Sequence, residues 1–252
     1  MIWLESILGT VLVLLAAGLM LVFLLPRFRQ GRGGLRAIPA LQRLQRAIGL
    51  AVEDGTRLHV SIGKASIFSP TNASALVGLS TLERIAQLSL VSDRPPVATS
   101  GDGTLSILSQ DTLRAAYRIA HVPEQYDAER GRLTGATPFS YVAGTLPILR
   151  DERVSTTILA GNLGPEAGLL ADASDQQNAF TLATSDALDA QAVFYATAEE
   201  TLIGEELFAL PAYLQAGAIY QASLRVQDVL RWVVIVLLLL AALASFFGLI
   251  AL

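Results

Sequence analysis

The chain contains no cysteine and only two histidines among its 252 residues. The lack of thiols excludes disulfides, thiolate zinc sites and iron–sulfur ligation. His59 and His121 are far apart and have no metal-type spacing to a pair of carboxylates, so we predict strand or turn residues there and no metal site. Charged residues make up only 16% of the chain, and the net charge is −4. An acidic balance of this kind argues against binding of nucleic acid, which usually needs a basic patch.

Lysine is almost absent, since Lys64 is the only one and arginine supplies every other basic side chain. Two interpretations are open: a general preference for arginine, or a lysine kept for a function. Ser61 and Lys64 have the spacing of a serine–lysine nucleophile pair, but the companion motifs of penicillin-recognising enzymes are missing. We therefore assign no catalytic residue and no cofactor.

Two long apolar runs without charge occupy residues 6–25 and 232–252. Each is long enough to cross a bilayer, which needs about 20 apolar residues. The residues before the first run include Glu5 and no basic side chain, and arginines follow the run directly. A secretory signal has the opposite arrangement, so we interpret the first run as a retained transmembrane helix.

The arginines beside the two runs predict the orientation of the chain. They follow the first run and precede the second, at Arg27, Arg29, Arg32, Arg36, Arg225 and Arg231. Because basic residues are enriched on the cytoplasmic side, we expect a cytoplasmic central domain and both termini on the outer side of the cell (inner) membrane. Trp3 and Trp232 lie at the edges of the runs, where interfacial anchors are expected.

These features divide the chain into four parts. We expect a transmembrane helix at 1–26, a joint and juxtamembrane helix at 27–52, a soluble domain at 53–208, and one long helix at 209–252 that continues into the second span. Gly31, Gly33 and Gly34 predict a flexible joint after the first span. No proline follows Pro211, which predicts an uninterrupted and stiff connection to the second span.

Between the ends, predicted strands and helices alternate. Strands are expected at 58–62, 97–100, 141–149, 154–160 and 180–184, and helices at 76–90, 105–119, from 164 onward, at 187–196 and at 201–214, with a linker at 121–135. Alternation of this kind predicts an α/β domain with a mainly parallel sheet covered by helices.

Two glycine-containing segments are candidates for binding a ligand. Gly101, Asp102, Gly103 and Thr104 join a predicted strand to a helix N-terminus, where free amides favour anions. The segment lacks the third glycine of a dinucleotide fingerprint and the lysine of a P-loop. Asp102 would also repel a phosphate, so a plain tight turn is the competing interpretation. Gly161, Asn162 and Gly164 form the second segment, for which a helix-entry turn is the alternative.

Several stretches of the chain are similar to a known family. They are VEDG at 52–55, LHVSIG at 58–63, GLSTLE at 78–83, QDTLRAAY at 110–117, GNLGPEAGLL at 161–170 and LIGEELF at 202–208. From about residue 37 to 230, the chain resembles a prokaryotic family of small membrane proteins known only as a domain of unknown function. The resemblance implies a membrane location and a soluble α/β domain, and it implies no activity and no catalytic residue.

The sequence leads to one main functional expectation and two alternatives. We expect an oligomeric, membrane-anchored scaffold or assembly protein without catalytic activity. Its expected partners are the bilayer and either further copies of the chain or other membrane proteins. Small residues in both apolar runs, such as Gly18 and Ala241, permit close packing of helices. One alternative is a ligand-binding domain or enzyme that uses residues 100–104 to hold a nucleotide or sugar-phosphate. The other is an accessory subunit of a larger membrane complex.

Overall fold

A computed structural model describes residues 2–25, 36–68, 72–90 and 92–246. The chain divides into two compact units, one formed by residues 1–35 and 217–252 and the other by residues 36–216. The larger unit is the α/β domain, and it is wider than the expected range of 53–208.

The α/β domain is built on one sheet of six parallel strands in the order β3-β2-β1-β4-β5-β6. The strands are β1 (Arg57–Gly63), β2 (Val97–Ser100), β3 (Gly131–Leu133), β4 (Val154–Asn162), β5 (Phe180–Ser185) and β6 (Glu200–Leu202). This order matches the doubly wound sheets in which strands are first added on one side of the first strand and then on its other side. The switch point therefore lies between β1 and β4. The expected parallel α/β architecture is confirmed.

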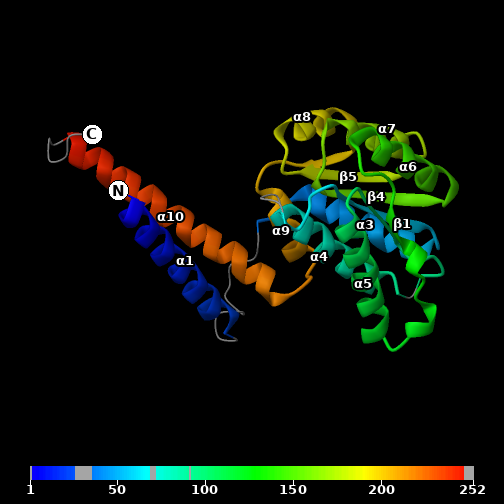
Figure 1. Cartoon of the computed structure of the whole chain (residues 1–252), viewed down its shortest axis with the longest axis horizontal. Coiled ribbons are helices and arrows are strands. Elements are labelled where there is room, and N and C mark those ends of the chain that lie inside the picture. Colours follow the sequence, from blue (N-terminus) through cyan, green and yellow to red (C-terminus); the bar gives the residue numbers. More distant parts are fainter. Residues whose placement is uncertain (1, 26–35, 69–71, 91, 247–252) are drawn as a thin grey trace. The chain divides into compact units, whose positions relative to one another are not determined.

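Helices cover both faces of the sheet (Figure 1). One face carries α3 (Pro39–Glu53), α4 (Asn72–Leu88), α5 (Gly103–Ile119) and α9 (Glu206–Tyr213), and the other carries α6 (Pro138–Asp151), α7 (Gly168–Asp175) and α8 (Leu188–Thr197). Short 3-10 helices are η1 (Pro123–Gln125), η2 (Ala128–Arg130) and η3 (Pro165–Ala167). Each face has its own apolar core. Every residue of β1 is buried, as expected for a central parallel strand.

The helix α3 belongs to the domain and is not a separate juxtamembrane element. Its apolar residues Leu41, Leu44, Ile48 and Ala51 are buried in the larger core. On its outer side, Arg43 forms an ion pair with Glu200 at the start of β6. The apolar face of this helix therefore packs on the sheet.

The strand predicted at 141–149 is wrong, because these residues form most of α6. The side chain of Thr137 caps the helix by accepting a hydrogen bond from the backbone N–H of Ser140, and Pro138 occupies the first turn. The buried residues of α6 have the spacing of one helical face; they are Tyr141, Val142, Thr145, Ile148 and Leu149. Aromatic and β-branched residues suggested a strand, but the helical period decides the structure.

Three other expectations need correction. The predicted linker at 121–135 contains the edge strand β3, and the predicted helix at 201–214 is divided into β6 and α9. The expected continuous helix from 209 onward is also interrupted. The helix α9 ends at Tyr213, Gln215 has a left-handed backbone with φ 59°, and α10 (Ala218–Phe246) begins after Gly217. A left-handed residue ends a helix because it turns the backbone away from the helical path.

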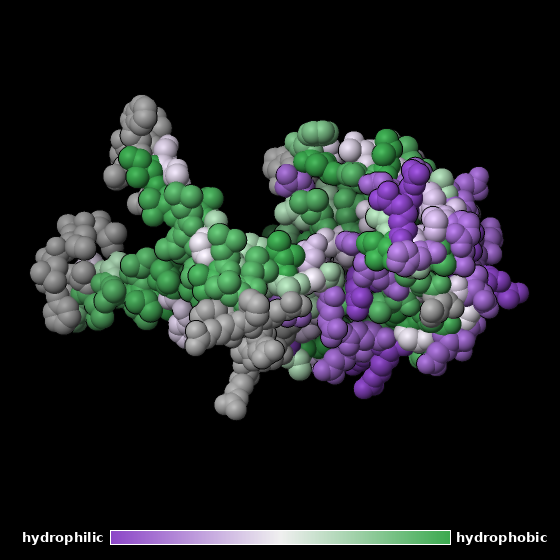
Figure 2. All heavy atoms as spheres, turned by 90° about the horizontal axis from the view of Figure 1, so that it is seen from below, coloured by the Kyte–Doolittle hydropathy of each residue, from purple (hydrophilic) through white to green (hydrophobic). Residues whose placement is uncertain are grey.

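The smaller unit contains α1 (Ile2–Leu24) and α10, which lie side by side, with the first residues of α1 near the same end of the pair as the last residues of α10 (Figure 1). Among the described residues, one helix is long and apolar enough to cross a membrane, at Ala218–Leu243, and the apolar part of α1, Gly9–Leu24, is shorter. The described atoms of the pair are mostly hydrophobic (Figure 2). The glycine joint predicted at Gly31, Gly33 and Gly34 lies outside the described residues.

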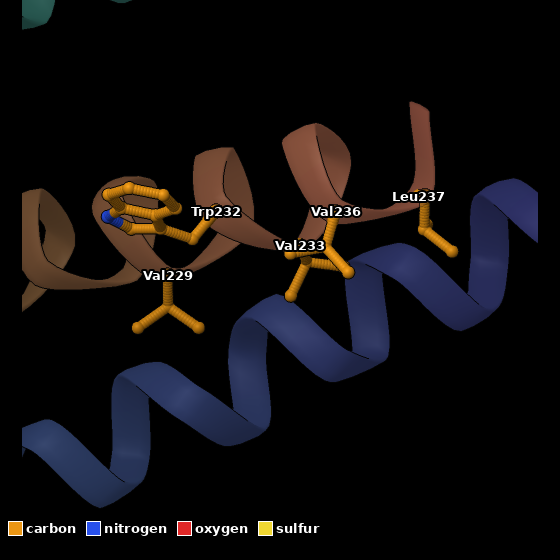
Figure 3. A pocket seen from close by; sticks show the side chains of 5 residues that line it. All are labelled: Val229, Trp232, Val233, Val236 and Leu237. Carbon is orange, nitrogen blue, oxygen red and sulfur yellow. The ribbon is translucent and has the colours of Figure 1, made fainter. Parts of the chain in front are cut away.

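A cavity of about 390 Å³ lies along α10. It is lined by Val229, Trp232, Val233, Val236 and Leu237. Val229 and Val233 point toward the neighbouring α1 (Figure 3). The lining is apolar apart from the indole N–H of Trp232.

Candidate functional site

The two predicted ligand segments meet at the carboxyl edge of the sheet. One follows β2, the other follows β4, and both are hydrogen-bonded to the end of β1. The N–H of Gly101 donates to the carbonyl of Gly63 at 2.8 Å, and the N–H of Lys64 donates to the carbonyl of Asn162 at 2.9 Å. The candidate residues are therefore gathered at the switch point, where ligands bind in many open α/β sheets.

The glycines at this edge allow the backbones of β1 and β4 to approach closely. Gly63 has a φ of +82°, and a Cβ there would overlap the carbonyl of Asn162. A Cβ on Gly161 would overlap the carbonyl of Ile62 in the same way. The register of the β1–β4 pair shifts at this place. The glycines thus have a structural role whether or not a ligand binds.

Lys64 crosses this edge, and its charge is already paired. Its side chain lies where a Cβ on Gly101 would be, and its Nζ lies 2.5 Å from Oε1 of Glu166. Only 19% of the Lys64 side chain and 8% of the Glu166 side chain are exposed. Gly164 leaves the space that the Glu166 carboxylate occupies. The only lysine of the chain is therefore placed at the switch point in a largely buried ion pair.

Carboxylates lie at the starts of three helices at this edge. Asp102 Oδ1 accepts a hydrogen bond from the N–H of Leu105 at 3.1 Å and caps α5. Glu166 lies in the 3-10 turn before α7. Asp186 accepts hydrogen bonds of 2.8 Å from Ser74, near the start of α4, and from Asn162. The positive ends of these helix dipoles are already balanced by protein carboxylates, which disfavours a phosphate at the same positions.

Gly103 and Thr104 make no such side-chain interaction with the residues that the structure describes. A Cβ on Gly103 would meet no atom within 4 Å, and Thr104 is half-buried. These two residues lie at the edge of the sheet but do not hold its other residues in place.

Ser61 and Lys64 do not form a nucleophile pair. The hydroxyl of Ser61 is buried and hydrogen-bonded at 2.5 Å to the hydroxyl of Tyr141, whereas Lys64 binds Glu166. Tyr141 also lies 3.1 Å from the hydroxyl of Thr99. Burial raises the pKa of Tyr141 above its ordinary value, against the effect of these hydrogen bonds. The sequence reading missed Tyr141 because it placed this residue on a strand.

His59 belongs to the same buried group. Its Nε2 lies 2.9 Å from the hydroxyl of Thr99, and its Nδ1 has no hydrogen-bond partner among the described residues. Burial, and to a smaller extent the charge of Arg132, lowers the pKa of His59 to about 3. The ring is therefore neutral at physiological pH. His121 has a φ of +60° just after α5, so both histidines have the strand and turn positions expected for them.

A second polar cluster was missed from the sequence because its members are far apart in the chain. Glu152, which follows α6, forms ion pairs with Arg57 and Arg132, and Arg130 lies 3.9 Å away. Burial lowers the pKa of Arg57, and the charges of Arg130 and Arg94 act in the same direction. This cluster is separate from the switch-point residues, since Arg57 begins β1 and Lys64 follows its end.

A cavity of about 400 Å³ lies between α3, α4 and the end of α9. Its lining includes Gln45, Glu53, Arg84 and Gln215. The Nε of Arg84 donates to the carbonyl of Leu214 at 2.8 Å, and Gln45 donates to the carbonyl of Tyr213 at 2.9 Å. These side chains hold the end of α9 in place. Across the described residues, no group of three or more histidine or acidic side chains is arranged to hold a metal ion.

The comparison with protein families agrees with the similarity seen in the sequence. A family model described as "Domain of unknown function (DUF6754)" matches residues 3–251. The chain belongs to this family. The DUF6754 match covers both apolar helices as well as the α/β domain, so the family is defined by both compact units together. No curated protein and no solved structure matches the chain.

Proposed function

We propose that this DUF6754 chain is a membrane-anchored assembly protein that acts through contacts and not through catalysis. In this proposal α1 and α10 both span the cell (inner) membrane, the α/β domain lies in the cytoplasm, and both termini lie outside. The scaffold is a homo-oligomer or binds other membrane proteins.

The exposed apolar surface of α10 carries this proposal. Its side chains from Trp232 to Leu240 are large, hydrophobic and between about 38% and 67% exposed. A soluble protein rarely leaves so large a continuous apolar surface in water, whereas a bilayer would cover it. The apolar side chains of α1, such as Val13 and Leu14, are similarly exposed. The antiparallel packing of α1 and α10 fits a two-span arrangement with both termini on one side (Figure 1).

Single cysteines test the topology cleanly, because the chain has none of its own. We would place one cysteine near the N-terminus as Glu5→Cys, one after Leu252, and one in the domain as Ala136→Cys, where the residue is exposed. A membrane-impermeant maleimide applied to intact cells should label the two terminal cysteines. It should label Ala136→Cys only after the cells are lysed.

The opposite labelling pattern would contradict the orientation, and release of the chain by alkaline carbonate would contradict membrane anchoring. Native mass measurement in mild detergent tests the oligomer. A monomer at high protein concentration would remove homo-oligomerisation from the proposal and leave the interaction with other proteins.

The position of Lys64 supports a second candidate, a small ligand bound at the switch point. A nucleotide or sugar-phosphate there would have to compete with Glu166 for the lysine and to approach Asp102 and Asp186. These acids make the site less suitable for an anion, so we rank this function second. An enzyme at this site would use the same residues: Gly101, Asp102, Gly103, Thr104, Gly161, Asn162 and Gly164.

The single lysine offers a direct test of ligand binding. An amine-reactive reagent can modify only Lys64 and the N-terminal amine, so the two rates are read separately by mass spectrometry. A nucleotide or sugar-phosphate that binds at the edge should slow modification of Lys64 and leave the N-terminal rate unchanged. If none of the ligands tested changed the rate of Lys64 modification, this function would be rejected.

A further inference from the structure

The exposed apolar residues of the α/β domain are concentrated at the carboxyl edge of the sheet. We define this edge as the connections after each strand and the first turns of the helices that follow; its segments are 64–68, 72–76, 101–107, 133–139, 163–169, 186–189 and 203–206. Eight large, exposed hydrophobic side chains lie there: Phe68, Leu76, Ile107, Leu133, Phe139, Leu169, Leu188 and Ile203. Only Leu50, Ile119 and Tyr195 are comparably exposed in the rest of the described domain.

These side chains are unusually accessible. Phe139 is 72% exposed and Leu188 is 80% exposed, on helices α6 and α8 of the same face. Isolated exposed hydrophobic residues are common on proteins, but a group at one edge is typical of an interaction surface. The arrangement requires an explanation because the other surfaces of the domain are mostly free of such residues.

The same edge is acidic. It contains six carboxylates and one lysine, which is already paired with Glu166; the acids are Asp102, Glu166, Asp186, Asp189, Glu205 and Glu206. The domain has twelve arginines within residues 36–216, and none of them lies in the edge segments. The edge segments therefore combine apolar side chains with an excess of carboxylates over basic residues.

The charge identifies the partner. We infer that the carboxyl edge is a docking surface for a basic, apolar segment of another protein, with lysine or arginine beside hydrophobic side chains. A second copy of the chain would place one acidic edge against another in a symmetric contact, which like charges oppose. An anionic membrane surface would be repelled for the same reason. This inference rests on the proposed assembly function and names the surface through which assembly occurs.

Two synthetic peptides of equal length test the inference with the full chain in discs of zwitterionic lipid. One peptide consists of leucine and lysine, and the other of leucine and glutamate. Fluorescence anisotropy measures binding, and the signal from empty discs is subtracted. The lysine peptide should bind, binding should weaken as salt rises, and carbodiimide should cross-link it to edge acids such as Asp189.

Matched double variants locate the surface. Phe139→Ser with Leu188→Ser should raise the Kd of the lysine peptide at least tenfold, because exposed apolar anchors provide most of the binding energy of an interface. Ile119→Ser with Tyr195→Ser removes two comparably exposed residues away from the edge and should leave the Kd unchanged. Equal binding of both peptides, or equal Kd values for the two variants, would overturn the inference.

Self-association is the remaining outcome. If the chain is oligomeric and Phe139→Ser with Leu188→Ser converts it to monomers, the occupant of the edge is a second copy and the inference is wrong. Membrane anchoring is measured separately by cysteine labelling, so failure of the docking surface is distinguished from failure of the proposed function.

Discussion

The central strand β1 has polar side chains at positions that water does not reach. His59 and Ser61 are fully buried and point toward the hydroxyls of Thr99 and Tyr141. Polar groups at such positions are tolerated because they are hydrogen-bonded to one another. Two nitrogens of this strand are exceptions, because His59 Nδ1 and Arg57 Nε are buried without a hydrogen-bond partner among the described residues.

This histidine should make the stability of the domain depend on pH. The pKa of His59 is about 3 in the folded chain and about 6.5 in the unfolded chain, so below pH 6.5 the unfolded state binds the extra proton. Stability is therefore complete above pH 6.5 and falls as the pH decreases toward 3. The loss between pH 7 and pH 5 should be about 2 kcal/mol.

Chemical unfolding at the two pH values checks this expectation. His59→Gln should remove most of the dependence, because glutamine does not titrate, whereas His121→Gln should retain it. If His59→Gln lost stability on acidification as strongly as the unaltered chain, the dependence would have another origin.

Two glycines at the carboxyl edge should respond oppositely to the same substitution. Gly63→Ala places a Cβ against the carbonyl of Asn162 on a left-handed backbone, so we expect a loss of about 2–4 kcal/mol. Gly103→Ala adds a methyl group to open space in the first turn of α5. It should be neutral or stabilise by up to about 1 kcal/mol. Urea unfolding of both variants measures the difference, and equal effects would contradict the close approach of β1 and β4.

At the level of the elements, Glu152 joins three parts of the fold. It connects the end of α6 to Arg57 of β1 and to Arg132 of β3. Glu152→Gln keeps the shape but leaves these partly buried guanidinium groups without their shared counter-charge. We expect a loss of about 3 kcal/mol, as when one partner of a buried pair is removed.

Asp151→Asn is the matched control for this experiment. Asp151 is exposed next to Glu152 and makes no ion pair recorded among the described residues, so its loss should change stability by less than about 0.5 kcal/mol. Thermal unfolding of both variants separates the buried cluster from a general effect of charge. Equal and small effects would show that the arginines are solvated.

The elements that sequence reasoning placed correctly are those with long, consistent patterns. The strand β1 alternates apolar with polar residues, β4 and β5 are rich in apolar and β-branched residues, and α5 has both a capping aspartate and an apolar stripe. The α6 segment was misassigned because Tyr141, Val142 and Thr145 favour strands locally. Their spacing and the capping Thr137 predict a helix, so this error was avoidable. The error at 201–214, where one helix was expected in place of β6 and α9, could not be avoided, because a three-residue edge strand has little periodic signal.

The candidate site was predictable in part. A turn between a strand and a helix can be recognised from Gly101 to Thr104, and its position at a carboxyl edge follows from parallel topology. The convergence of Lys64, Gly101 and Glu166 depends on the strand order, which a single sequence does not reveal. The Glu152 cluster was hidden for the same reason, since its arginines come from different elements.

At the scale of the whole molecule, the boundary between the domain and the apolar helices determines which part folds alone. The compact unit contains residues 36–216, whereas the sequence suggested 53–208. The shorter range omits α3 and divides α9. It therefore removes Leu41, Leu44 and Ile48, all buried in the core, together with Leu210 and Leu214.

The omitted side chains should decide whether the domain is stable. Burial of a leucine or isoleucine contributes about 1.5–3 kcal/mol, so the three residues of α3 alone contribute about 5–9 kcal/mol. A domain of this size is stable by only about 5–15 kcal/mol in total, and loss of α3 also exposes the face of the sheet beneath it. We therefore expect residues 36–216 to be soluble without detergent and to unfold cooperatively in urea. Residues 53–208 should be unfolded or aggregated under the same conditions, and cooperative unfolding of that shorter chain would show that α3 is not part of the core.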